Sequence, residues 1–226
     1  MSLRLSRTVP WGRSMQEYEL MFDLSESDRL GRVLGCGDGP ASFNAEMTAR
    51  GCSVISCDPI YDLSPANIEE QFEAGVEPIM SQVRAHRENY VWSYHRDPEA
   101  LLNCRKAVMR RFITDYPAGL AQCRYVACEL PQLPFKGQEF DLALCSHLLF
   151  LYSKLFSLTF HIESVLELCR IAKEVRIFPL TDSSCERSPY VAPVELAVRE
   201  LGWRTQIMRV NYQVQRNGNE MLRIWK

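Results

Sequence analysis

The chain has 226 residues, of which 46% are hydrophobic and 24% are charged. These proportions are typical of a globular protein with one substantial core, so a single domain over residues 1–226 is expected. The formal net charge of -2 excludes the strongly basic field of a dedicated nucleic-acid binder. A small-molecule substrate is therefore favoured over nucleic acid.

The cysteines and the most apolar segment narrow the class of protein further. The nine cysteines are odd in number and form no CxxC pair, so neither a disulfide framework nor a metal site is expected. The amino-terminal residues lack the apolar run of a secretory signal. The apolar stretch 142–160 is interrupted by Ser146, His147, Ser153 and Lys154, which indicates a buried strand and a loop rather than a membrane span. We expect a cytoplasmic protein without a membrane partner, and the oligomeric state stays open.

The first elements form a βαβ pattern. Ser14 and Glu17 match a capping box, which predicts a short amphipathic helix that ends before Gly31. A βαβ unit follows this helix. Its parts are a strand at 32–34, a glycine turn at 35–39, a helix from Pro40 to Gly51, and a strand at 52–57 that ends at Asp58 and Pro59.

A helical and polar segment occupies residues 64–120. It is long for one crossover, so we expect two or three helices that form an insertion beside the ligand pocket. Its basic residues alternate with Tyr90, Trp92 and Tyr94, and the favoured interpretation is a solvated helical face with the aromatic rings packed inward. The alternative is a surface that binds an anionic substrate or single-stranded RNA. The basic residues are Arg84, Arg87, Arg96, Arg105, Lys106, Arg110 and Arg111.

The remaining elements complete an α/β pattern. Further strands are predicted at 124–128, 140–145 and 174–178, with helices at 162–173 and 193–201. Strands at 205–215 and 220–225 flank Asn217 and Gly218, a strong hairpin signal. The predicted fold is Rossmann-like, with a seven-stranded, mostly parallel sheet, helices on both faces and a C-terminal antiparallel hairpin.

The glycine turn is the first candidate binding element. Gly35, Gly37 and Gly39 lie between a strand and a helix, where they permit a sharp turn and a close approach to a ligand near free helix amides. The spacing GxGxG lacks the third glycine of the dinucleotide fingerprint, so NAD is disfavoured. Asp58 follows the next strand, where its carboxylate can accept hydrogen bonds from both ribose hydroxyls. A ribose-bearing cofactor fits this pattern.

Two motifs carry a family resemblance. Residues 33–39 (V-L-G-C-G-D-G) with Asp58, and then residues 129–135 (E-L-P-Q-L-P-F) with 140–147 (F-D-L-A-L-C-S-H), resemble the class I S-adenosylmethionine-dependent methyltransferases. The resemblance covers residues 34–178 outside the insertion and implies S-adenosyl-L-methionine as the cofactor. It assigns the cofactor to Gly35, Cys36, Gly37, Asp38, Gly39, Asp58, Pro59, Glu129, Leu130 and Ser146.

The resemblance also implies individual roles and shows two departures. In the family, the residue that matches Glu129 contacts the adenine amino group, and the amide that matches Leu130 contacts the ring. The family usually carries an acid where this chain has Val33, and aspartate where it has Glu129. Asp38 could take over part of the missing acid's role. The amino-terminal residues 10–22 are in addition similar to uncharacterised bacterial methyltransferase-like proteins.

Four residues are candidates for catalysis or substrate binding. His147 lies just beyond a strand end, where it can act as general base or as a hydrogen-bonded structural residue. Arg13 and Tyr18 can cover the cofactor and the substrate, or serve as a surface ion and a packing ring. Tyr152 can line the pocket or belong to the core.

The expected function is an S-adenosylmethionine-dependent methyltransferase acting on an unidentified, small-molecule acceptor. Two alternatives remain: a non-catalytic protein that binds S-adenosylmethionine or a partner, and a nicotinamide-dependent oxidoreductase.

Overall fold

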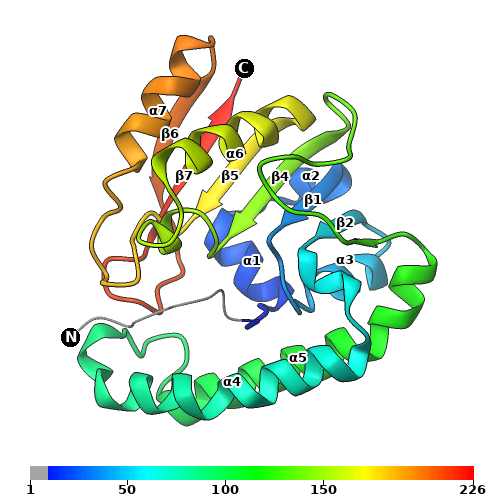
Figure 1. Ribbon diagram of the computed structural model, residues 1–226, viewed down its shortest axis with the longest axis vertical. Helices are drawn as coiled ribbons and strands as arrows, with labels where there is room; N and C mark the ends of the chain where they lie inside the picture. The colour runs from blue at the N-terminus through cyan, green and yellow to red at the C-terminus, as the bar shows by residue number, and fades with distance from the viewer. Residues whose placement is uncertain (1–9) are drawn as a thin grey trace.

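The structure is a computed structural model and describes residues 10–226. Its centre is the seven-stranded sheet that the sequence predicts, and the strands lie in the order β3-β2-β1-β4-β5-β7-β6 (Figure 1). The strands β1 to β5 are parallel, and β7 runs antiparallel to both β5 and β6. The strands are β1 (Arg32–Cys36), β2 (Ser53–Cys57), β3 (Tyr125–Val126), β4 (Phe140–Ser146), β5 (Ala172–Phe178), β6 (Arg204–Arg209) and β7 (Glu220–Trp225).

Helices surround the sheet. The capping box at Ser14 is present and begins α1, with Glu17 as its third helical residue. The α-helices are α1 (Met15–Phe22), α2 (Glu26–Leu30), α3 (Phe43–Ala49), α4 (Pro65–Ala85), α5 (Pro98–Ala121), α6 (Leu158–Ile171) and α7 (Val191–Glu200). The short 3-10 helices are η1 (Pro59–Asp62), η2 (Arg87–Asn89) and η3 (Phe150–Tyr152). Within residues 10–226, no helix combines the length and the apolar character that crossing a membrane requires.

Each face of the sheet has its own hydrophobic cluster. Successive residues of a strand point to opposite faces, and β4 shows this alternation. Leu142 and Leu144 pack with α1 and α3, whereas Ala143 and Cys145 pack with α6 and α7. The sheet is therefore a buried middle layer, and its strand ends supply the surfaces on which a ligand can bind.

The helices expected at 64–120 are α4 and α5, which pack against each other along their length. In Figure 1 they lie below the ends of β4 and β5, at the edge of the sheet where the parallel strands finish. A third cluster joins the pair to that edge: Phe72 of α4 and Phe112 of α5 pack with Tyr61 and Tyr125. The two helices thus cover the carboxyl ends of the strands.

The structure corrects the predicted start of α3. The helix begins at Phe43 and not at Pro40, because the amino-terminal segment lies directly against residues 40–42. A Cβ atom on Gly12 would overlap the Pro40 carbonyl, and the Ser42 amide donates to the Arg13 carbonyl at 3.1 Å.

The predicted end of the sixth strand is also wrong. β6 stops at Arg209, the Val210 amide still donates to the Asn219 carbonyl at 3.0 Å, and residues 211–218 leave the hairpin to contact the insertion. The Val91 amide donates to the Val214 carbonyl, and the Arg216 amide donates to the Asn89 carbonyl, both at 2.8 Å. These long-range bonds draw the segment away from β7.

Candidate functional site

A cavity of about 350 Å³ lies at the carboxyl ends of β1, β2 and β4. The sheet order reverses at β1, and such a switch point is where open α/β sheets bind ligands. The structure brings most of the predicted site residues to this cavity, while Gly35 and Tyr18 lie outside its wall. The predicted residues that line it are Arg13, Cys36, Gly37, Asp38, Gly39, Asp58, Pro59, Glu129, Leu130, Ser146, His147 and Tyr152.

The glycine loop keeps its expected shape but not all of its expected free amides. Gly37 and Gly39 have positive φ angles of 67° and 55°, which favour glycine. The Gly37 amide donates to the Cys57 carbonyl at 2.8 Å, and the Gly39 amide donates to Asp58 Oδ2 at 2.9 Å. The Ser42 amide is also used, by the Arg13 carbonyl. The loop therefore offers close approach to a ligand, and these three amides already have partners inside the chain.

Asp38 forms the buried acidic floor of the cavity. Its carboxylate lies where a Cβ atom on Gly35 would be, which gives that glycine its role outside the cavity wall. Asp38 accepts hydrogen bonds from the hydroxyls of Tyr18 and Ser56, each at 2.6 Å. Burial raises the pKa of Asp38 to about 7, against the opposing effect of these two bonds. Val33, where the family usually has an acid, is buried in the core.

Tyr18 acts through Asp38 rather than on the cavity itself. The ring is 1% exposed and stacks on Phe43 with a centroid distance of 4.1 Å. Tyr18 therefore packs α1 against α3 and holds the Asp38 carboxylate in place.

Two more carboxylates, those of Asp58 and Glu129, face the cavity from neighbouring strand ends. Asp58 follows β2, and its Oδ1 atom accepts a hydrogen bond from the Ile60 amide at 2.9 Å. Burial raises the pKa of Asp58, and the nearby charge of Glu129 adds to this effect. A carboxylate has about four acceptor positions, so Asp58 can still accept hydrogen bonds from a ligand after bonding to the Ile60 and Gly39 amides.

His147 lies directly after β4, with a positive φ angle of 53°. Its amide donates to the Phe178 carbonyl at 2.6 Å, and its Nδ1 atom lies 2.9 Å from Ser146 Oγ. Burial holds the pKa of His147 well below its ordinary value, and the positive charges of Arg13 and Arg105 lower it further. The imidazole is therefore neutral at pH 7 with one ring nitrogen unprotonated, and burial and the two guanidinium charges oppose its protonation.

A second cavity of about 100 Å³ adjoins the first. The two share Trp11, Arg13, His147 and Tyr152 as wall residues. The other walls come from α4, α5, η3 and the 211–218 segment. Among the residues that sequence reasoning did not assign to a site are Trp11, Arg105 and Tyr212, which come together only through contacts between distant segments.

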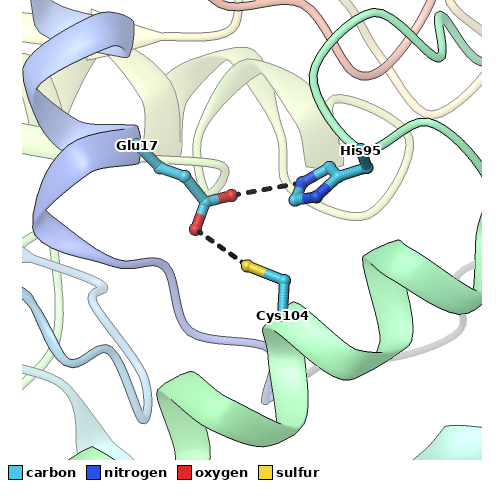
Figure 2. Close-up of side chains that lie close together, drawn as sticks. All are labelled: Glu17, His95 and Cys104. Atoms are coloured by element: carbon cyan, nitrogen blue, oxygen red, sulfur yellow. Dashed lines mark hydrogen bonds and ion pairs between the residues drawn. The ribbon is translucent and has the colours of Figure 1, made fainter.

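A buried polar cluster lies behind the second cavity, and Figure 2 shows three of its members, Glu17, His95 and Cys104. Their ligand atoms are close enough together for a metal ion. However, Arg105 donates to both Glu17 oxygens, at 2.9 and 2.5 Å, and the Tyr212 hydroxyl donates at 2.7 Å. Burial alone would raise the pKa of Glu17, but the Arg105 charge holds it well below its ordinary value. The cluster is an internal ion pair between α1 and α5.

Arg105 also corrects the interpretation of the insertion. Its side chain is 2% exposed and paired, so it does not belong to a solvated face. The other arginines of that set are exposed: Arg84, Arg87, Arg96, Arg110 and Arg111.

The chain is similar to one curated protein in sequence and to several solved structures. No model of a known protein family matches the chain. The uncharacterized protein MJ0045 of Methanocaldococcus jannaschii is 31% identical over 221 residues, which cover 97% of both chains. Mitomycin 7-O-methyltransferase MmcR has a TM-score of 0.52 at 12% identity, covering 94% of this chain and 53% of that one. A SAM-dependent methyltransferase from Aquifex aeolicus has a TM-score of 0.43 at 14% identity, covering 92% and 90%.

Sequence identity at this level over nearly the whole chain shows the family, and the sheet order shows the fold. The chain belongs to the family of MJ0045, and its fold is that of the class I S-adenosylmethionine-dependent methyltransferases.

Proposed function

We propose that the chain is an S-adenosylmethionine-dependent methyltransferase that acts on a small-molecule acceptor. The observation that carries the proposal is the pair of cavities that meet at His147. The larger cavity would hold the cofactor, and the smaller one would hold the acceptor. The name of the neighbour MmcR, a mitomycin 7-O-methyltransferase, agrees with methyl transfer to a small molecule.

The donors and acceptors around the larger cavity fit an adenosyl group. Asp58 can accept from the ribose hydroxyls, and Glu129 can accept from the adenine amino group. Ile60, Leu130 and Phe160 line the same cavity and supply apolar surface for the flat ring.

S-adenosylmethionine would supply an activated methyl group for in-line transfer. This transfer would join the methyl group to an oxygen or nitrogen atom of the acceptor and leave S-adenosylhomocysteine. The chain then has to align the two reactants, exclude water and accept the acceptor's proton. His147 is placed for the last task, because it lines both cavities and its imidazole is neutral.

The alternatives predict different ligands. An oxidoreductase requires a nicotinamide cofactor, but the loop of Gly35, Gly37 and Gly39 lacks the dinucleotide spacing. A non-catalytic protein would bind S-adenosylmethionine without transferring its methyl group.

Transfer of a labelled methyl group tests the proposal. The wild-type protein is incubated with methyl-labelled S-adenosylmethionine and the small-molecule fraction of a cell extract. We expect label in a small molecule, and a rate about 100-fold lower for His147→Ala, because a positioned base contributes about this factor. His161→Ala is not a suitable control, since His161 is fully buried; His86→Ala changes a half-exposed histidine instead. Cofactor binding without any labelled product would favour the non-catalytic alternative.

A further inference from the structure

The smaller cavity has apolar walls, two guanidinium groups and, among the described residues, no carboxylate. Its volume of about 100 Å³ is less than the about 150 Å³ of an apolar protein cavity that holds benzene, so a molecule with a ring would extend from it into the adjoining larger cavity. The apolar walls are Ile79, Tyr90, Leu101, Leu151 and Val214.

The two guanidinium groups differ in how they are neutralised. Arg105 forms a bidentate ion pair with Glu17, so its charge is balanced inside the protein. The Glu17 oxygens also accept from Ser14 and Tyr212, which leaves little capacity for a second cation.

Arg13 has no such partner. Its Nη1 atom donates to the Trp11 carbonyl at 2.6 Å, its Nε atom is buried without a hydrogen bond, and no carboxylate within residues 10–226 forms an ion pair with it. The Trp11 Nε1 atom is buried without a partner as well. Burial lowers the pKa of Arg13, and the Arg105 charge lowers it further. The Arg13 side chain is half-buried and the Glu17 charge favours its protonated form in part, so a ligand carboxylate in direct contact would supply the opposite charge that Arg13 lacks.

We infer that the acceptor is a compact, largely apolar molecule that carries one carboxylate, and that Arg13 pairs with this carboxylate in the smaller cavity. The inference rests on the proposed function, because it names the class of acceptor for the same site. The carboxylate would anchor the molecule at the junction of the two cavities, so that a second, methyl-accepting atom can lie beside His147.

The methyl donor also carries a carboxylate, which is the competing partner for Arg13. Arg13 lines both cavities, but the larger cavity also has the acidic groups Asp38, Asp58 and Glu129 on its walls. Among the described residues the smaller cavity has no carboxylate on its walls, and its Arg105 is already paired with Glu17. Charge balance therefore favours an anion in the smaller cavity.

Binding of two probes that share a phenyl ring and differ in charge tests the inference. The full chain, saturated with S-adenosylhomocysteine, is titrated with benzoate and with benzyl alcohol. We expect benzoate to bind at least about tenfold more tightly, because hydrogen bonds between charged groups contribute more than those between neutral groups. Arg13→Gln should lower the affinity for benzoate by about tenfold and leave the affinity for benzyl alcohol unchanged. Arg13→Lys should recover part of the lost affinity for benzoate.

Arg110→Gln is the matched control, because it removes the same charge from an exposed position on α5. This variant should bind both probes with the affinity of the wild type. Equal affinities for benzoate and benzyl alcohol in the wild type would overturn the inference.

Two ligands of the cofactor site distinguish pairing of Arg13 with the methyl donor from pairing with the acceptor. If Arg13→Gln weakens S-adenosylhomocysteine but not 5′-methylthioadenosine, which lacks the amino-acid carboxylate, Arg13 pairs with the donor and the inference is wrong. If the wild type binds no S-adenosylhomocysteine, the proposed function fails. Benzoate titrated into the unliganded chain then still shows whether Arg13 binds a carboxylate.

Discussion

Single residues set the chemistry of the site, and Asp38 is the most perturbed of its acids. Its carboxylate lies under the glycine loop between two hydroxyl donors, and burial raises its pKa to about 7. The family resemblance assigned Asp38, Asp58 and Glu129 to one cofactor site, and all three line the larger cavity. Sequence reasoning could not find the contact of Asp38 with Tyr18, since that contact depends on how α1 packs against α3.

The raised pKa of Asp38 predicts how stability changes with pH. The unfolded chain releases this proton near pH 3.8, whereas the folded chain keeps it until about pH 7. The unfolded state therefore binds fewer protons in this interval, and the contribution of Asp38 to the free energy of unfolding falls as the pH rises from about 4 to about 7. Urea unfolding should show a steeper fall for the wild type than for Asp38→Asn.

Asp115 should change the stability in the opposite direction with pH, because its pKa is lowered in the folded chain. Burial would raise its pKa, but the hydrogen bonds from Arg124 and Tyr125 lower it, so Asp115→Asn should remove stability that is present above pH 4. For Asp38, an identical change of the free energy of unfolding with pH in the wild type and in Asp38→Asn would contradict the raised pKa of this residue.

At the level of elements, the regular parts of the fold follow from local sequence. The capping box at Ser14, the βαβ unit and two or three helices in the insertion were predicted from local sequence patterns, and the structure has two long helices in the insertion. The errors lie where distant segments meet. The end of β6 depends on bonds between residues 211–218 and the loop after α4, and the start of α3 depends on the close contact of Gly12 with Pro40.

The contact at Gly12 predicts a large effect of a small substitution. In Gly12→Ala the new methyl group would overlap the Pro40 carbonyl, so the amino-terminal segment has to move away from the glycine loop. We expect a loss of about 1–3 kcal/mol in the free energy of unfolding, the usual cost of overpacking. Chemical denaturation gives this value directly.

Gly75→Ala is the matched control for this substitution. Gly75 lies inside α4, where a Cβ atom would meet only Ile79 Cδ1 at 3.8 Å. Alanine should stabilise the helix by about 0.5–1 kcal/mol. A Gly12→Ala protein as stable as the wild type would show that the contact is not tight.

In the whole molecule, a buried ion pair joins the insertion to α1. Glu17 of α1 and Arg105 of α5 are 88 residues apart; Arg105 lines the smaller cavity, and Glu17 lies behind it. Local sequence could not reveal this pairing, and on sequence alone Arg105 resembled its exposed neighbours.

Removal of one partner should therefore be costly. In Glu17→Gln the Arg105 charge stays buried without its carboxylate, and we expect a loss of about 3–5 kcal/mol in the free energy of unfolding. Glu77→Gln removes a carboxylate from an exposed pair with Arg84 and should cost less than about 1 kcal/mol. Equal losses in the two variants, measured by chemical denaturation, would contradict the role of Glu17.

Calorimetric titration with S-adenosylhomocysteine is the most direct test of a cofactor site at the switch point of the sheet. We predict one-to-one binding by the wild type and affinity at least about tenfold weaker for Asp58→Ala, which loses the charged acceptor for the ribose hydroxyls. Asp62→Ala, an exposed change in the same short helix η1, should bind as the wild type does. Absence of heat with S-adenosylhomocysteine, together with binding of NADH, would contradict the account.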